Sequence, residues 1–188
     1  MAFQLAQPTE GPPVAQPDRD QAALRRLQAD APRHWDEADR DLFAVVGHHV
    51  QSRTDAGDFP PNAADPGALA GPLYRFLLQH RARKDSSHAR LCGWLASACM
   101  GSHHLWQDLG LAERPQVSRL LRLAFPTLHD SNTRQLRWKR HLFLSLGESL
   151  GRPGLRPPKC DGCPEVSVCM DDPQSTVRLV GIDAAGAA

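Results

Sequence analysis

Three of the five cysteines lie close together near the C-terminal end, in the sequence KCDGCPEVSVC. They are Cys160, Cys163 and Cys169, with the spacing C-x2-C-x5-C. Thiolates spaced in this way can converge on one inorganic centre, since zinc is bound by cysteine sulfurs at about 2.3 Å and iron–sulfur clusters are held by cysteine thiolates. Packing does not require such a group, because a buried thiol behaves as one small hydrophobe among many. The spacing predicts a metal or cluster site with these three ligands.

Two other interpretations of this loop remain open. One is a redox-active C-x-x-C motif, although no βαβ pattern of the thioredoxin kind surrounds it. The other is a set of unrelated surface thiols. Three thiolates are also fewer than the four ligands of a closed structural zinc site. A metal site here therefore takes a further ligand from elsewhere or leaves one position open.

The candidates for an additional ligand are Cys99, His103 and His104. Cys99 and His103 follow Cys92 at i+7 and i+11, so the three side chains can share one helical face. Imidazole is a common ligand for iron and for borderline metals. The structural alternative is that Cys99 packs in the core, where free cysteine is often found. The histidines would then cap a helix or hydrogen-bond across a loop.

The composition is that of an ordinary globular protein. The chain has 188 residues, 41% hydrophobic and 23% charged, with a formal net charge of +1. This balance predicts neither nucleic acid nor membrane as a partner, and no apolar run approaches the roughly 20 residues that span a bilayer. The first residues lack the basic start and long apolar stretch of a secretory signal. We therefore expect a cytoplasmic protein, in which clustered cysteines bind metal more often than they form disulfides.

Hydrophobic periodicity predicts an all-α, single-domain fold of about six helices, since no segment alternates as a strand does. The expected helices span about 20–30, 36–51, 66–83, 86–100, 115–125 and 131–150. The expected organisation is a disordered segment over 1–20, a helical domain over 21–155, a cysteine metal loop over 156–172 and a flexible tail over 173–188.

No catalytic residues are predicted. The chain has no phosphate-binding glycine loop, no paired-carboxylate site and no Ser-His-Asp arrangement, and HHLWQD lacks the H-E-x-x-H pattern of zinc proteases. We therefore expect a protein that is not an enzyme.

Three blocks of the sequence resemble the NifQ family of nitrogen-fixation proteins. The blocks are ACMGSHHLWQDLGL (98–111), LLRLAFPTLHDSNTRQLRWKR (120–140) and the cysteine loop. The resemblance covers about residues 70 to 170 and implies a non-catalytic protein that processes and donates molybdenum for the iron–molybdenum cofactor of nitrogenase. It further implies an iron–sulfur cluster, of the 3Fe–4S or 4Fe–4S type, that can include molybdenum. The implied partners are the NifEN scaffold and NifH, with molybdate or a molybdenum–sulfur species as cargo.

The family pattern is C-x4-C-x2-C-x5-C, and its last three cysteines match Cys160, Cys163 and Cys169. Its first cysteine falls on Leu155, which cannot ligate a metal. Three thiolates can still hold three irons of a cuboidal cluster and leave the fourth corner for molybdenum or an outside ligand. Two alternatives stay open: a divergent family member that has lost cluster binding, and a zinc-stabilised binding module.

Basic residues gather beside the cysteine loop. Between residues 134 and 159 there are seven, against the single acid Glu148: Arg134, Arg137, Lys139, Arg140, Arg152, Arg156 and Lys159. This excess would attract molybdate or offset the negative charge of a thiolate-ligated cluster. It would equally serve to dock an acidic partner, and the structural alternative is a solvated helix face.

Overall fold

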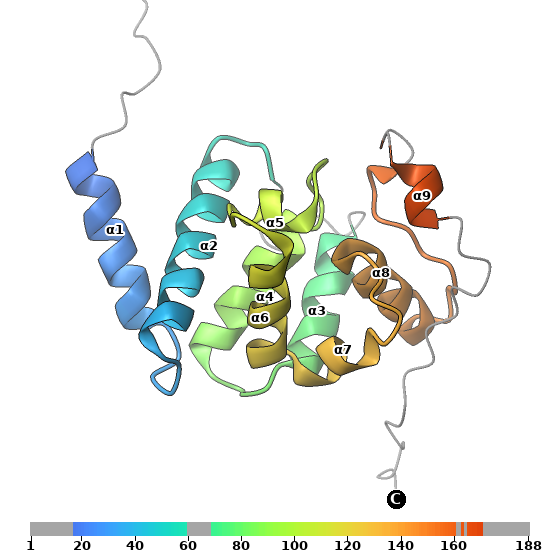
Figure 1. Ribbon diagram of the computed structural model, residues 1–188, viewed down its shortest axis with the longest axis horizontal. Helices are drawn as coiled ribbons and strands as arrows, with labels where there is room; N and C mark the ends of the chain where they lie inside the picture. Colours follow the sequence, from blue (N-terminus) through green and yellow to red (C-terminus); the bar gives the residue numbers. More distant parts are fainter. Residues whose placement is uncertain (1–16, 60–68, 161–162, 164, 171–188) are drawn as a thin grey trace, which may run out of the picture.

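The computed structural model describes residues 17–59, 69–160, 163 and 165–170. All regular structure in these ranges is helical, which confirms the predicted all-α class. The described helices are shown in Figure 1 and are α1 (Pro17–Asp30), α2 (Glu37–Asp55), α3 (Ala70–His80), α4 (Ser86–Ala98), α5 (Leu105–Asp108), α6 (Arg114–Ala124), α7 (Pro126–Ser131), α8 (Trp138–Ser149) and α9 (Val166–Met170).

Each of the six expected helices has a counterpart, namely α1, α2, α3, α4, α6 and α8. Two expected caps are also present: the Asp85 side chain accepts a hydrogen bond from the His88 N–H at the start of α4, and Pro115 lies in the first turn of α6. The three remaining helices, α5, α7 and α9, are four, six and five residues long and were not expected. So few residues make too few turns to show a helical period in the sequence.

The predicted start of the last helix at Ser131 is wrong, because α8 begins at Trp138. The preceding segment is a loop closed by Asn132, whose Oδ1 accepts from the Leu136 N–H (2.8 Å) and whose Nδ2 donates to the Leu136 carbonyl (3.0 Å). Asparagine side chains compete with helical hydrogen bonds in this way. Gln135 has φ +55° in the same loop, which a helix does not allow.

The segments outside the helical domain are described only in part. Residues 17–20 belong to α1, whereas residues 1–16 of the predicted N-terminal segment and all of the predicted tail over 173–188 lie outside the described residues. The same holds for 161–162, 164 and 171–172 of the predicted metal loop. The described part of that loop includes the short helix α9.

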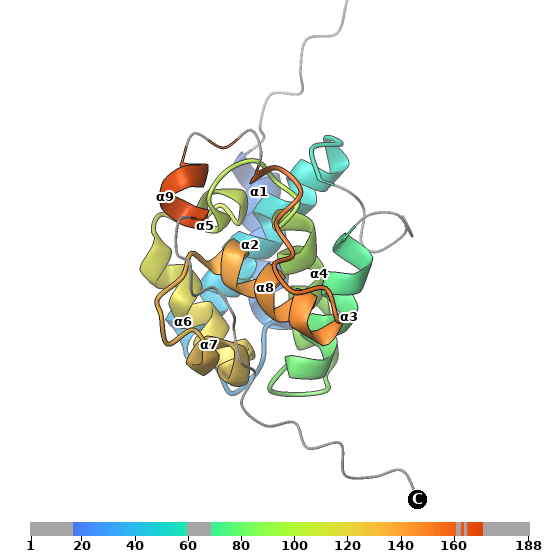
Figure 2. The same cartoon turned by 90° about the vertical axis from the view of Figure 1, so that its right-hand side faces the viewer.

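Helix α4 forms the centre of the core. Its residues from Leu91 to Ala98 are all buried and, apart from Ser97, carry no polar side chain, as expected of a helix enclosed by others. The views in Figures 1 and 2 place α1 at one end of the bundle and α9 at the opposite end, beyond α8. The cysteine segment is therefore carried on the edge of a packed helical body.

Helices α2 and α4 meet at Gly47. A Cβ atom at this position would lie 2.6 Å from the indole ring of Trp94, closer than packed atoms approach. We expect Gly47→Ala to lower the free energy of unfolding by about 1–3 kcal/mol, because an overpacked core forces side chains out of their preferred rotamers. Chemical denaturation measures the change. Val45→Ala on the same helix, at a position 37% exposed, serves as the control, and an equal loss there would contradict the explanation.

Within the described residues, no helix combines the length and apolarity needed to cross a membrane.

Candidate metal centre

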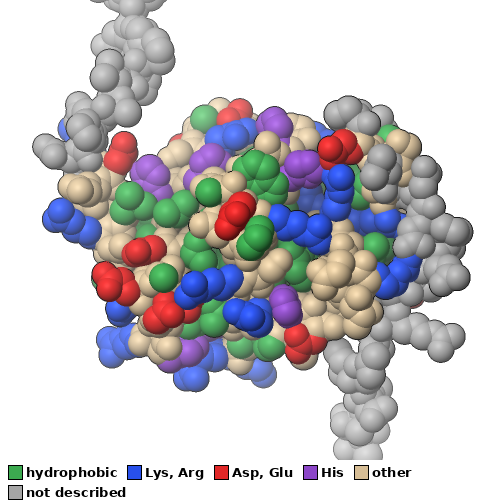
Figure 3. Space-filling view, viewed as in Figure 1, with side chains coloured by type: hydrophobic (Ala, Val, Ile, Leu, Met, Phe, Trp, Pro, Cys, Tyr) green, Lys and Arg blue, Asp and Glu red, His purple; other side chains and the backbone are tan. Residues whose placement is uncertain are grey.

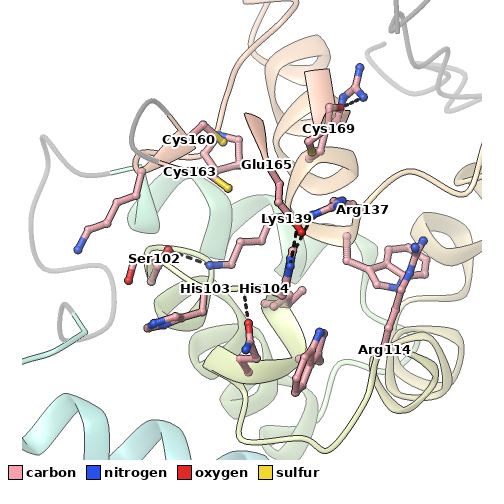
Figure 4. A pocket seen from close by; sticks show the side chains of 18 of the residues that line it. Ser102, His103, His104, Arg114, Arg137, Lys139, Cys160, Cys163, Glu165 and Cys169 are labelled. Carbon is pink, nitrogen blue, oxygen red and sulfur yellow. Dashed lines mark hydrogen bonds and ion pairs between the residues drawn. The ribbon is translucent and has the colours of Figure 1, made fainter. Parts of the chain in front are cut away.

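The three cysteines of the C-x2-C-x5-C motif line a single cavity of about 520 Å³. Figure 4 shows how they enter it: Cys160 and Cys163 from the loop after α8, and Cys169 from α9. All three thiols are half-buried. The opposite wall is formed by the segment 101–107 around α5 and by the first residues of α8. The structure thus brings together two regions that are about sixty residues apart in the sequence.

Local hydrogen bonds fold the cysteine loop. The Cys163 N–H donates to the Cys160 carbonyl (3.0 Å), and the Cys169 N–H donates to the Glu165 carbonyl (2.9 Å). The pKa of Cys160 is raised, first by burial and then by the neighbouring thiols of Cys169 and Cys163. The thiols of Cys163 and Cys169 therefore both lie within electrostatic range of Cys160. Even so, no three Cys, His, Asp or Glu side chains of the described residues lie close enough together to hold a single metal ion.

Cys99 lies in the hydrophobic core rather than in the cavity lining. It is fully buried, and burial raises its pKa to about 12. The same holds for Cys92, whose pKa burial also raises to about 12. Both side chains act as small hydrophobes at neutral pH, which agrees with the packing interpretation of this helical face.

His103 and His104 both line the cavity, but they have different partners. His103 Nδ1 lies 3.2 Å from Oδ1 of the buried Asp108. His104 is engaged on both ring nitrogens: Nε2 lies 3.1 Å from Glu165 Oε2, and Nδ1 lies 3.5 Å from Arg137 Nη1. The two adjacent histidines therefore belong to two separate polar groups in the wall.

Asp108 holds one of these groups together. Its carboxylate is fully buried and accepts from Lys139 Nζ (2.5 Å) and from the His103 N–H (3.2 Å). Lys139 Nζ also donates to the Gly101 carbonyl (2.9 Å). A Cβ atom on Gly101 would overlap the Asp108 carboxyl group, so glycine is required there. This group fixes the loop before α5 to the first turn of α8.

A second set of contacts positions the start of α8. The Arg114 guanidinium on α6 donates to the carbonyls of Gln135 (2.8 Å) and Leu136 (3.2 Å). Trp138 is anchored as well, since its Nε1–H donates to Ser118 Oγ (3.0 Å). The chain therefore enters α8 in a fixed direction, with Arg137 at the helix N-cap and its side chain on the cavity.

Cationic side chains surround the cavity. Among the described residues, five of them line it, against one acid, Glu165: Arg114, Arg137, Lys139, Arg140 and Lys159. Figure 3 shows Lys and Arg side chains gathered on this side of the molecule, over α8 and α9. Four of the five belong to the basic excess seen in the sequence. Arg114 was missed because it lies on α6, outside that stretch.

The NifQ family profile matches residues 36–171. This range contains both walls of the cavity and all three cysteines of the motif. The chain belongs to the NifQ family.

The curated NifQ relatives are similar over part of their length. A NifQ homologue of Sinorhizobium fredii is 35% identical over 106 residues, which are 56% of this chain and 46% of that protein. NifQ of Azotobacter vinelandii is 37% identical over 93 residues, 50% of this chain and 48% of that protein. NifQ of Rhodobacter capsulatus is 33% identical over 113 residues, 58% and 63% of the two chains. The chain spans about half the length of the first two relatives. No solved structure matches it.

Leu155, where the resemblance places the first cysteine of the family pattern, packs against α8. It is partly buried against the core, and a Cβ on Gly147 would lie 2.7 Å from its own Cβ. The Arg152 N–H donates to the Gly147 carbonyl (2.7 Å) and turns the chain back onto the helix. In this NifQ chain the side chain at residue 155 therefore fastens the segment that leads into the cysteine loop.

Glu165 is a cavity residue that the sequence analysis missed. Its carboxylate pairs with Arg137, which lowers the pKa of Glu165, and His104 contributes in the same direction. The sequence feature that could have identified Glu165 is its position between two predicted ligands, Cys163 and Cys169. Glu165 lies beyond the basic stretch that ends at Lys159.

The residues of the cavity suit a thiolate-bound cluster. Soft thiolate donors favour iron–sulfur centres, and each iron needs only one of them, so the donors of a cluster stand farther apart than those of one ion. A volume of about 520 Å³ is also that of a pocket for a sizeable ligand. The cationic lining offsets the negative charge that thiolates and sulfides bring.

Proposed function

We propose that this protein binds an iron–sulfur cluster in the cavity and donates molybdenum for the synthesis of the nitrogenase iron–molybdenum cofactor. It acts as a carrier and not as an enzyme, and works in the cytoplasm. Cys160, Cys163 and Cys169 are the proposed ligands. The single observation that carries the proposal is that these three thiols line one cation-rich cavity together with the residues of the two other NifQ-like blocks.

In this proposal, the thiols and the cationic residues of the cavity have different roles. The thiols supply soft ligands for iron, and a cluster held in this way offers sulfur atoms to which molybdenum binds. The cationic residues balance the charge of the loaded site. The pKa of Arg137 is raised first by its hydrogen bond to Glu165, and the nearby Cys169 and Cys163 add to this in the same direction. Because three thiolates leave part of a cuboidal cluster uncovered, the cargo has an exit.

NifEN and NifH are the proposed partners. The supporting observation is the position of the site: the cysteines lie on α9 and its loop, at the edge of the bundle, and are half-buried rather than enclosed in the core. An acceptor protein can reach such a site without unfolding the helical body.

Anaerobic purification with metal analysis tests the proposal. We expect iron and molybdenum in the oxygen-free protein, together with broad visible absorption from thiolate-to-iron charge transfer, and we expect exposure to air to bleach this absorption. A colourless preparation with zinc alone would instead support a zinc-stabilised binding module. A preparation without metal, even after reconstitution with iron and sulfide, would indicate a family member that has lost cluster binding.

A further inference from the structure

The Glu165 carboxylate occupies a pocket of hydrogen-bond donors inside the cavity. Its Oε2 accepts from the Arg137 guanidinium and lies 3.1 Å from His104 Nε2. Arg137 Nη1 lies 3.5 Å from His104 Nδ1, so a tautomer with the proton on Nε2 satisfies both contacts of the ring. Figure 4 shows Glu165 between the cysteines, with Arg137 and His104 at its carboxylate.

The surroundings of this pocket favour anions. The first turn of α8 lines the same cavity, and the N-terminus of a twelve-residue helix carries partial positive charge that attracts anions. In the part of the lining that the structure describes, Glu165 is the one acidic residue beside five cationic residues. A carboxylate placed among these groups indicates an anion site that is filled by a side chain of the chain itself.

The carboxylate is held in a way that allows it to leave. The side chains of Glu165, Arg137 and His104 are 45%, 35% and 40% exposed, and ion pairs exposed to this extent add little stability. Glu165 directly precedes α9, whose other end is held separately by Arg140 donating to the Cys169 carbonyl. Moving the carboxylate therefore leaves α9 attached to α8.

We infer that Arg137 and His104 form an oxyanion-binding subsite of the cavity, which Glu165 fills until a tetrahedral oxyanion of the molybdate class displaces it. The subsite itself follows from the geometry, whereas the identity of the oxyanion rests on the proposed function. No covalent bond changes in this exchange. The planar guanidinium fork of Arg137 suits two oxygens of such an anion, and it lies within electrostatic range of Cys163 and Cys169. The bound oxyanion would thus sit beside two proposed cluster ligands.

Calorimetric titration of the reduced, metal-free protein with molybdate tests the inference. Glu165→Gln should lower the Kd for molybdate by about tenfold, because the competing charge is gone, and Arg137→Gln should raise it by about tenfold or more. Glu148→Gln and Arg152→Gln make the same charge changes outside the cavity lining and should leave the Kd within about twofold. If Arg137→Gln fails to fold, Arg137→Lys keeps the charge without the fork and should still weaken binding.

The other arms of the titration decide the class of anion. Tungstate, which has the shape and charge of molybdate, should bind equally well, whereas sulfate and phosphate binding as tightly as molybdate would contradict the molybdate assignment. Equal Kd values for Glu165→Gln and Glu148→Gln, or no molybdate binding by either, would overturn the subsite.

Iron content separates this inference from the proposed function. A protein that loads iron but binds no oxyanion would keep its proposed role and lose the subsite. A protein that binds molybdate through Arg137 but never loads iron would keep the subsite and lose the proposed role.

Discussion

Replacing Cys163 by alanine is expected to reduce bound iron and molybdenum to background, a loss of about tenfold or more, while the helices stay folded. Mutation of a residue that only hydrogen-bonds to a metal ligand lowers metal affinity about 10- to 100-fold. Loss of the ligand itself lowers it at least as much. Cys163 lies in a half-buried loop, and its backbone N–H bond to Cys160 does not depend on the side chain. The free energy of unfolding should therefore change by less than about 1 kcal/mol. Metal analysis of the anaerobic protein and circular dichroism measure the two effects.

Cys92→Ala is the matched control for this experiment. It also removes one thiol, but from the core, where burial raises the pKa of Cys92 to about 12. The side chain therefore stays a protonated thiol, which does not bind metal. We expect this variant to keep its iron and to lose some stability. If Cys163→Ala unfolds while Cys92→Ala does not, the metal is structural, and the donor proposal loses its main support.

Replacing Asp108 by alanine is expected to lower the free energy of unfolding by about 3–5 kcal/mol, because a buried ion pair that loses one partner leaves the other charge uncompensated. Asp108 is fully buried, and the Lys139 side chain that pairs with it is only 12% exposed. The substitution also removes the acceptor for the His103 N–H, and it leaves the hydrogen bond from Lys139 to the Gly101 carbonyl to hold the loop before α5 against α8. Chemical denaturation of the metal-free protein measures the loss.

Two further variants define what this loss means. Asp130→Ala removes a carboxylate that is 76% exposed beside His129, and should change the stability by less than about 0.5 kcal/mol. Asp108→Ala combined with Lys139→Met should be more stable than Asp108→Ala alone, since it no longer leaves a buried charge without its partner. If the double variant is as unstable as the sum of the single changes, the pair does not account for the effect.

The sequence was sufficient to predict the helical fold because the long helices repeat their apolar residues over several turns. The prediction failed where a side chain hydrogen-bonds to the backbone and interrupts the helical pattern of apolar residues. The predicted last helix includes Ser131 to Arg137. In the structure, Asn132 bonds to both backbone groups of Leu136 and makes a loop there. That loop brings Arg137 and Lys139 to the cavity, so the element boundary that was hardest to predict is also the one that shapes the site.

The candidate site was predictable in its cysteines and only partly in its other wall. The spacing of Cys160, Cys163 and Cys169 points to metal from local sequence alone. The Asp108–Lys139 pair and the Arg137–Glu165 pair join residues that are 31 and 28 positions apart, and nothing in a single sequence marks such partners. His103 and His104 were identified as candidates by residue type, but their different partners became visible only in the folded chain.

The contact between Leu155 and Gly147 limits how far Cys160 can move away from α8. Cys160 follows this fastening point by five residues, two of them prolines, and even a fully extended chain of that length reaches only about 17 Å. The Cys160 thiol is thus joined to the helical body by a short segment of restricted flexibility and cannot move to a distant recipient. Under the proposed donor role, delivery would therefore take place with the surface of the recipient already in contact with this protein.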